Sequence, residues 1–217
     1  MELLRGDGRL LRIGHRGVTD GVDVVELDVI GGLLVAHSRA DAEGAPCLDD
    51  ELERLAGRGL AVQIDVKEPG LAPGIAAALA RHGLGQRSFV SAPSLPILRE
   101  FAAAAPALPR SLSYPADRLG LSSRPGAAPL VRAGLAAGRV ALPSRLPRLL
   151  RSVRASAVTL DHRVVSNRAI EVCHRRGVAV IVWTVNEPAL ATSLVARGID
   201  AIITDDPGIV PARPSTS

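Results

Sequence analysis

The chain has 217 residues, a formal net charge of +4 at pH 7, 47% hydrophobic residues and only 2% aromatic ones. This length suits one domain with a large core, and neither a charge block nor a linker divides it, so we expect a single domain over residues 1–217. Scattered arginines and very few aromatic side chains argue against a nucleic-acid partner.

The sequence predicts a cytoplasmic protein. No apolar run approaches the roughly 18 residues that cross a bilayer, and the N-terminus lacks the apolar core of a signal peptide, so we expect no integral membrane segment. Cys47 and Cys173 have no metal-type spacing, which indicates reduced intracellular thiols.

Short apolar runs alternate with helical patterns along the chain. The expected strands are 10–14, 22–29, 60–66, 88–91, 108–112, 157–160, 178–184 and 199–204. The expected helices are 49–56, 72–81, 93–103, 146–154, 166–176 and 188–196. This alternation predicts an α/β fold with a parallel sheet, and eight units in one domain predict a closed (β/α)₈ TIM barrel.

Two segments depart from a regular barrel. The stretch from His15 to Val22 leaves no room for a crossover helix, which needs a dozen or more residues, so the first crossover helix is expected to be missing. The gap that it leaves is a candidate surface for a homodimer. The segment 113–156 is rich in Pro, Gly, Ser and Arg, which predicts irregular loops, with a stray short strand at 139–143.

Polar side chains lie at the C-terminal ends of the expected strands, on the face where barrel enzymes carry their chemistry. They are His15, Arg16, Glu26, Asp28, Asp65, Lys67, Ser91, Trp183, Asn186, Asp205 and Asp206. Glu26 and Asp28 alternate with apolar residues, so they share one face of a strand about 7 Å apart and can share a cation. Lys67 is the only lysine among 26 basic residues, which suggests a place that requires a compact charge.

The pair Gly31-Gly32 predicts a hairpin directly after the carboxylates. A two-residue turn there sets Ile30 opposite Leu33 and Glu26 opposite His37. Because opposed residues share a face, His37 is expected to join the carboxylates.

The motifs together resemble the glycerophosphodiester phosphodiesterase family over most of the chain. They are GHRG at 14–17, ELD at 26–28, His37, IDVK at 64–67, VWTVN at 182–186 and IITDDP at 202–207. The resemblance implies a TIM barrel that hydrolyses glycerophosphodiesters, small-molecule substrates, to an alcohol and glycerol 3-phosphate with a divalent cation, Mg²⁺ or Ca²⁺.

The resemblance also implies roles for single residues. Glu26, Asp28 and Asp65 would hold the metal, since carboxylate oxygens suit a hard cation. His15 and His37 would act as general acid and base near neutral pH. Arg16 and Lys67 would hold the phosphate. Trp183, the only tryptophan, is either a pocket wall or core filling.

The sequence also departs from the family pattern. A Glu-Asn-Thr segment and the helix after it are absent, Asp65 replaces a glutamate, Ser38 an aspartate and Ala92 a phenylalanine. Two alternatives therefore stay open. One is a lyase similar to sphingomyelinase D or the phosphatidylinositol phospholipases, which would form a cyclic phosphate, and the other is a non-catalytic phosphate-binding or scaffold barrel.

Overall fold

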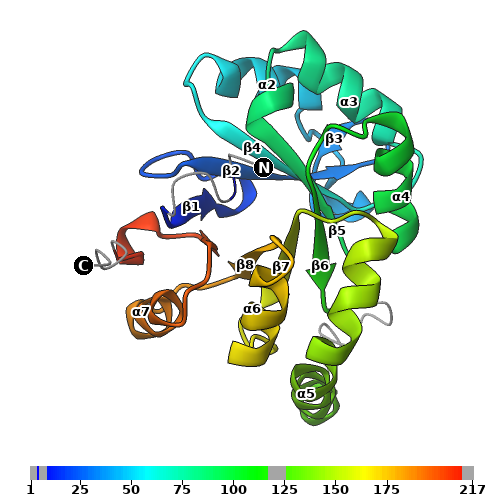
Figure 1. Cartoon of the computed structure of the whole chain (residues 1–217). Coiled ribbons are helices and arrows are strands. Elements are labelled where there is room, and N and C mark those ends of the chain that lie inside the picture. The colour runs from blue at the N-terminus through cyan, green and yellow to red at the C-terminus, as the bar shows by residue number, and fades with distance from the viewer. Residues whose placement is uncertain (1–3, 5–8, 117–125, 212–217) are drawn as a thin grey trace.

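The computed structural model describes residues 4, 9–116 and 126–211, and its centre is a closed barrel of eight parallel strands (Figure 1). The barrel strands are β1 (Leu11–Gly14), β2 (Val24–Ile30), β4 (Ala61–Val66), β5 (Ser88–Ala92), β6 (Arg110–Tyr114), β7 (Ala157–Asp161), β8 (Ala179–Trp183) and β9 (Ala201–Thr204). The barrel closes because β1 pairs with β9 on one side and with β2 on the other. The prediction of a TIM barrel is confirmed.

Within the described residues, six α-helices surround the barrel, with α2 to α4 on one side and α5 to α7 on the other (Figure 1). They are α2 (Leu48–Ala56), α3 (Ala72–Arg81), α4 (Leu95–Ala104), α5 (Ala128–Ser152), α6 (Asn167–His174) and α7 (Pro188–Ala196). A proline in the first turn begins α3, α4, α5 and α7, where its missing N–H costs nothing. Among the described residues, no helix has the length and apolar character needed to cross a bilayer.

The connection from β1 to β2 contains one short 3₁₀ turn, η1 (His15–Gly17), and no α-helix. The prediction that the first crossover helix is missing is therefore confirmed.

Alternation along the strands separates two apolar clusters and carries polar residues to one end of the barrel. On β2, Val25 and Leu27 pack outward under the helices, whereas Val24 packs inside the barrel with Ile13 and Phe89. Since side chains alternate with period two, Glu26 follows Val24 on the inner face, nearer the carboxyl end. The bottom of the barrel is thus apolar and its top is polar.

The predicted hairpin exists, but its register is wrong by one residue. Strand β3 (Leu34–Val35) runs antiparallel to β2, with Ile30 opposite Leu34 rather than Leu33. The turn has three residues, 31–33, and Leu33 adopts a left-handed φ of 56° as its last residue. The two glycines therefore begin the turn, and an αL residue completes it.

The short strand predicted at 139–143 is wrong, because these residues lie inside α5. Two interior prolines, Pro143 and Pro147, each cost a helix about 3 kcal/mol. The buried leucines of α5 are Leu135, Leu142, Leu146 and Leu150. At about 1.5–3 kcal/mol each, their burial offsets both prolines. The part of the predicted irregular segment at 117–125 lies outside the described residues.

Candidate active site

The turn after β1 positions His15 and Arg16 at the top of the barrel. A side chain at Gly14 would collide with the backbone oxygen of Val18, because a Cβ there would lie 1.9 Å from it. Arg16 adopts a left-handed φ of 48°, which is costly for a residue with a Cβ. The glycine therefore allows the chain to fold back on itself, and the strained arginine projects its side chain toward the ends of the strands.

Three carboxylates from two neighbouring strands meet beside this turn. Glu26 and Asp28 on β2 and Asp65 on β4 each offer an oxygen within 4.8 Å of the others, and all three residues are buried. The parallel pairing sets Asp28 directly beside Asp65. Lys67 places Nζ 2.7 Å from Asp28 Oδ1 and also contacts Asp65 Oδ2. Lys67 is therefore an ammonium group set directly between two of the three acidic groups.

This crowding changes the proton affinity of the cluster. Burial, together with repulsion from Asp65 and Asp28, raises the pKa of Glu26 to about 8. Burial also favours the neutral acid of Asp28, but the charge of Lys67 and hydrogen bonds from Lys67 and His37 outweigh it and lower the pKa of Asp28. For Lys67, burial favours the neutral amine, but the charges of Asp65 and Asp28 outweigh it and raise its pKa.

Each of the two predicted histidines is held through Nδ1 by a carboxylate. His15 Nδ1 lies 2.7 Å from Asp205 Oδ1, and His37 Nδ1 lies 2.6 Å from Asp28 Oδ2. Asn186 donates from Nδ2 to the other oxygen of Asp205. This arrangement fixes both rings and leaves each Nε2 available for proton transfer.

Asp65 is held by a chain of hydrogen bonds inside the barrel. Ser91 Oγ donates to Asp65 Oδ1 over 2.5 Å, and Gln63 Nε2 donates to Ser91 Oγ over 2.9 Å. These contacts fix the shorter aspartate arm that stands where the family pattern has glutamate.

The eight residues predicted for the site all line one cavity of about 160 Å³ at the top of the barrel. They are His15, Arg16, Glu26, Asp28, His37, Asp65, Lys67 and Trp183. Trp183 forms part of the wall, and its buried indole Nε1 has no hydrogen-bond partner among the described residues. An indole N–H that faces a polar cavity can donate to a ligand oxygen.

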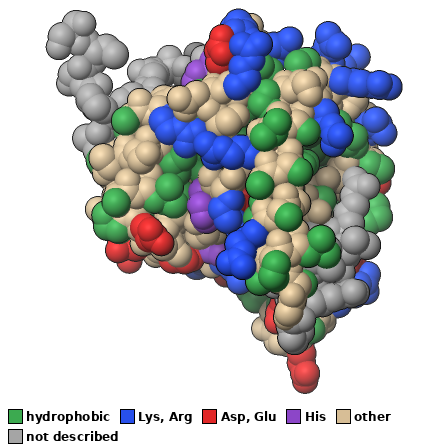
Figure 2. Space-filling model, turned by 90° about the horizontal axis from the view of Figure 1, so that it is seen from below, with side chains coloured by type: hydrophobic (Ala, Val, Ile, Leu, Met, Phe, Trp, Pro, Cys, Tyr) green, Lys and Arg blue, Asp and Glu red, His purple; other side chains and the backbone are tan. Residues whose placement is uncertain are grey.

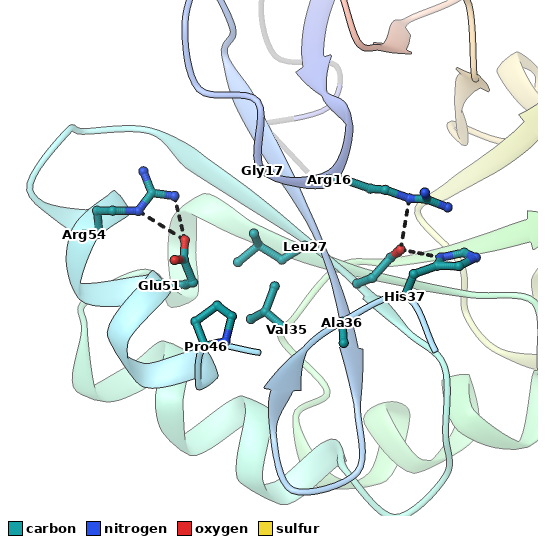
Figure 3. Close-up of a pocket in the computed structure, with 10 residues that line it drawn as sticks. Arg16, Gly17, Leu27, Val35, Ala36, His37, Pro46, Glu51 and Arg54 are labelled. Carbon is teal, nitrogen blue, oxygen red and sulfur yellow. Dashed lines mark hydrogen bonds and ion pairs between the residues drawn. The ribbon is translucent and has the colours of Figure 1, made fainter. Parts of the chain in front are cut away.

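A second cavity of about 360 Å³ adjoins the first and shares Arg16, Asp28 and His37 with it. In Figure 3, Arg16 and His37 point to Asp28 on one side of this cavity, and the ion pair between Glu51 and Arg54 of α2 lies on the other. The remaining lining is Gly17, Leu27, Val35, Ala36 and Pro46. We call this space the side cavity. It lies beside the shortened β1–β2 connection.

The acidic cluster fits a divalent cation. Three carboxylate oxygens from separate residues form a donor set that hard cations such as Mg²⁺ and Ca²⁺ prefer. Burial, together with repulsion from Asp65 and Asp28, raises the pKa of Glu26, and a bound cation would relieve that repulsion. These residues could therefore hold a metal ion.

The structure adds two residues whose part in the site the sequence did not predict. Asp205 and Asn186 were recognised only as polar residues at strand ends, yet they hold His15 from β9 and β8. The signal was their position after the last two strands, because barrel closure brings β9 beside β1.

A TIM barrel with paired histidines and clustered carboxylates at the carboxyl ends of its strands has the groups that acid–base catalysis requires at the end where barrel enzymes carry their active sites. Residues 39–209 match the Glycerophosphoryl diester phosphodiesterase family. The chain therefore belongs to this family, whose members are phosphoric diester hydrolases, as the resemblance predicted. The match begins after His37, so five of the eight predicted site residues precede it. No curated protein matches the chain.

Solved structures share the fold at low sequence identity. A glycerophosphodiester phosphodiesterase from Parabacteroides distasonis is 16% identical, with a TM-score of 0.69 over 91% of this chain and 93% of that one. A phosphodiesterase from Oleispira antarctica, in complex with the product sn-glycerol-3-phosphate, is 16% identical, with a TM-score of 0.70 over 92% and 94%. A glycerol uptake operon antiterminator-related protein from Thermotoga maritima is also similar, at 16% identity and a TM-score of 0.54 over 92% and 96%. These likenesses concern the fold, which does not by itself determine an activity.

Proposed function

We propose that this protein hydrolyses glycerophosphodiesters to an alcohol and glycerol 3-phosphate, with a divalent cation held by Glu26, Asp28 and Asp65. The observation that carries the proposal is that His15 and His37, each held through Nδ1 by a carboxylate, line the same cavity as the acidic cluster. The product bound to the Oleispira antarctica phosphodiesterase supports the substrate class.

Arg16 and Lys67 would bind the phosphate. The guanidinium of Arg16 is half exposed and lies 3.5 Å from Asp28, so it can turn toward an anion at little cost. Its planar fork matches two phosphate oxygens, whereas Lys67 adds a point charge from the end of β4.

The two histidines would move the protons. One Nε2 would accept a proton from the attacking water as the new P–O bond forms, and the other would give a proton to the departing alkoxide as the old P–O bond breaks. Asp205 and Asp28 would orient the two rings and stabilise their protonated forms. A cation bound by the three carboxylates would supply Lewis-acid polarisation of a phosphoryl oxygen. Trp183 would form the wall of the pocket.

The side cavity offers a place for the departing alcohol. It borders Arg16 and His37, and its floor is formed by apolar side chains, including Leu27 and Val35. An alcohol with some apolar surface would thus be bound next to the histidine that protonates or deprotonates it. The homodimer and the cytoplasmic location stay predictions.

The direct test uses the purified protein with glycerophosphocholine and bis(p-nitrophenyl) phosphate, each with EDTA, Mg²⁺ or Ca²⁺. We expect turnover with a divalent cation and glycerol 3-phosphate as the phosphorus NMR product. A cyclic phosphate that persists would instead support the lyase. The absence of turnover, together with a melting temperature that neither cation changes, would support a non-catalytic barrel.

A further inference from the structure

Helix α5 carries the excess positive charge of the chain. Its 25 residues include five arginines and no acidic residue. The formal net charge of the whole chain is +4, so the residues outside α5 sum to a net charge of −1. The positive charge is therefore concentrated on one helix, and the rest of the chain is nearly neutral.

The guanidinium groups of α5 are exposed and available. All five arginines are exposed, and within the described residues none of them forms an ion pair with a carboxylate. They are Arg132, Arg139, Arg145, Arg148 and Arg151. In contrast, most of the other exposed arginines in the described residues form an ion pair with a carboxylate. Examples are Arg58 with Asp20 and Arg81 with Asp49.

The same helix exposes hydrophobic side chains. In the described part of the chain, the two large hydrophobic residues that are exposed are Leu130, at 62%, and Val140, at 82%, and both belong to α5. Both side chains are exposed, as are the five arginines, whereas the leucines at 135, 142, 146 and 150 of the same helix are buried.

A groove of about 570 Å³ runs between α5 and α6. Val140, Pro143 and Pro147 line one wall, and Val172 lies on the other, among Arg168, Arg175 and Arg176. Figure 2 views the molecule from the side of α5 and α6 and shows Lys and Arg side chains interspersed with hydrophobic ones across this face. The surface thus combines anion-binding groups with apolar contacts.

We propose that the outer face of α5 docks on an anionic lipid bilayer surface. Exposed arginines attract acidic head groups, and exposed aliphatic side chains enter the boundary between head groups and acyl chains. A nucleic acid fits less well, because α5 offers no aromatic side chain for stacking and its hydrophobic residues would face phosphates. Two copies of α5 facing each other would place like charges together, which disfavours a homodimer at this face.

The test measures co-sedimentation of the full chain with vesicles of phosphatidylcholine alone or mixed with phosphatidylglycerol. We expect binding that requires phosphatidylglycerol and weakens with salt. The variant R139Q/R148Q/R151Q should reduce the affinity roughly 100-fold, because each basic residue near an anionic surface contributes about one factor of five. The variant V140D should also weaken binding, and circular dichroism verifies that both variants fold.

The matched control is R58Q/R81Q/R87Q, which removes the same charge from the α2–α3 side of the molecule and should bind like the wild type. An equal loss in this control would show that net charge alone attracts the vesicles and would overturn the proposal. Equal binding to both kinds of vesicle would also overturn it. So would binding to duplex DNA but not to vesicles, or a dimer in solution that V140D dissociates.

Discussion

Glu26 should make the stability of the metal-free protein fall as the pH rises. Its pKa is raised from 4.5 to about 8 by burial and by its carboxylate neighbours. The folded state binds this proton more tightly than the unfolded state. The contribution of Glu26 to the free energy of unfolding is therefore fully present below pH 4.5. It is lost as the pH rises through about 8.

The size of this effect follows from the shift. A change of about 3.5 units corresponds to roughly 5 kcal/mol in the free energy of unfolding. Between pH 5 and pH 7 the loss amounts to roughly 2–3 kcal/mol. For a chain of this length, that lowers the melting temperature by roughly 5–10 °C.

The assay is thermal unfolding in EDTA from pH 5 to pH 9 for the wild type and Glu26→Gln. The amide has the same shape and no titrating group, so the difference between the two curves isolates Glu26 from other titrating residues. Glu53→Gln, on the exposed side of α2, serves as the control and should follow the wild type.

A divalent cation should oppose this loss of stability at high pH. Below pH 8 the cation must displace the proton of Glu26, so its affinity should rise by up to about tenfold per pH unit. Saturating Mg²⁺ or Ca²⁺ should therefore raise the melting temperature more at pH 8 than at pH 6. Parallel curves for the wild type and Glu26→Gln in EDTA, or a cation effect that does not depend on pH, would refute the reasoning.

Five other substitutions test the proposed roles. His15→Ala and His37→Ala should each abolish turnover, while calorimetry still detects cation binding. Lys67→Met leaves two buried carboxylates without their cation, so we expect a loss of about 3–5 kcal/mol in urea unfolding, partly recovered by Mg²⁺. Asp205→Asn should lower kcat 10- to 100-fold and change its pH profile without weakening cation binding. Val35→Trp should fill the side cavity and raise KM for substrates with large alcohols, and an unchanged KM would contradict the placement of the alcohol there.

Alternation of side chains made the barrel and its polar end predictable from the sequence. Most of the strands are short and apolar, and a polar residue near the carboxyl end of a strand shares a face with the residue two positions earlier, as Glu26 does with Val24. Glu26 and Asp28 follow Val24 in this way, and the parallel pairing of β2 with β4 then brings Asp65 beside Asp28. The alternation of side chains along each strand and the pairing of neighbouring barrel strands are enough to predict that these three carboxylates lie together.

In the hairpin, the predicted register is wrong, but the predicted position of His37 beside the carboxylates is correct. The register is shifted by one residue, which would turn His37 to the outer face if the ladder continued. The ladder instead stops at Val35, and only one further bond, from Ala36 N to Asp28 O, holds the chain to β2. His37 lies beyond the end of β3, so the alternation of side chains along the strand does not set its direction, and its ring contacts Asp28. The predicted contact therefore exists, but strand register is not its cause.

The length of α5 could not be predicted because local signals opposed it. Gly134, Gly138, Pro143 and Pro147 indicate loops when they are read one at a time. The helix forms because leucines spaced along one face are buried against the barrel, which is a tertiary effect. The positive charge of α5 is visible in the sequence, but its concentration on one exposed face became apparent only with the helix.

The loss of the first crossover helix does not leave His15 without support. That helix would normally pack outside β1 and β2, and its absence makes the connection between them short. Support comes instead from the closure of the barrel: β1 pairs with β9, and Asp205 at the end of β9 holds the His15 ring. On the other side, the backbone N–H of Arg16 donates to Glu26 over 3.4 Å. The His15 ring is thus held by Asp205, 190 positions away, and the neighbouring Arg16 backbone is held by Glu26. The space beside the shortened connection becomes available as the side cavity.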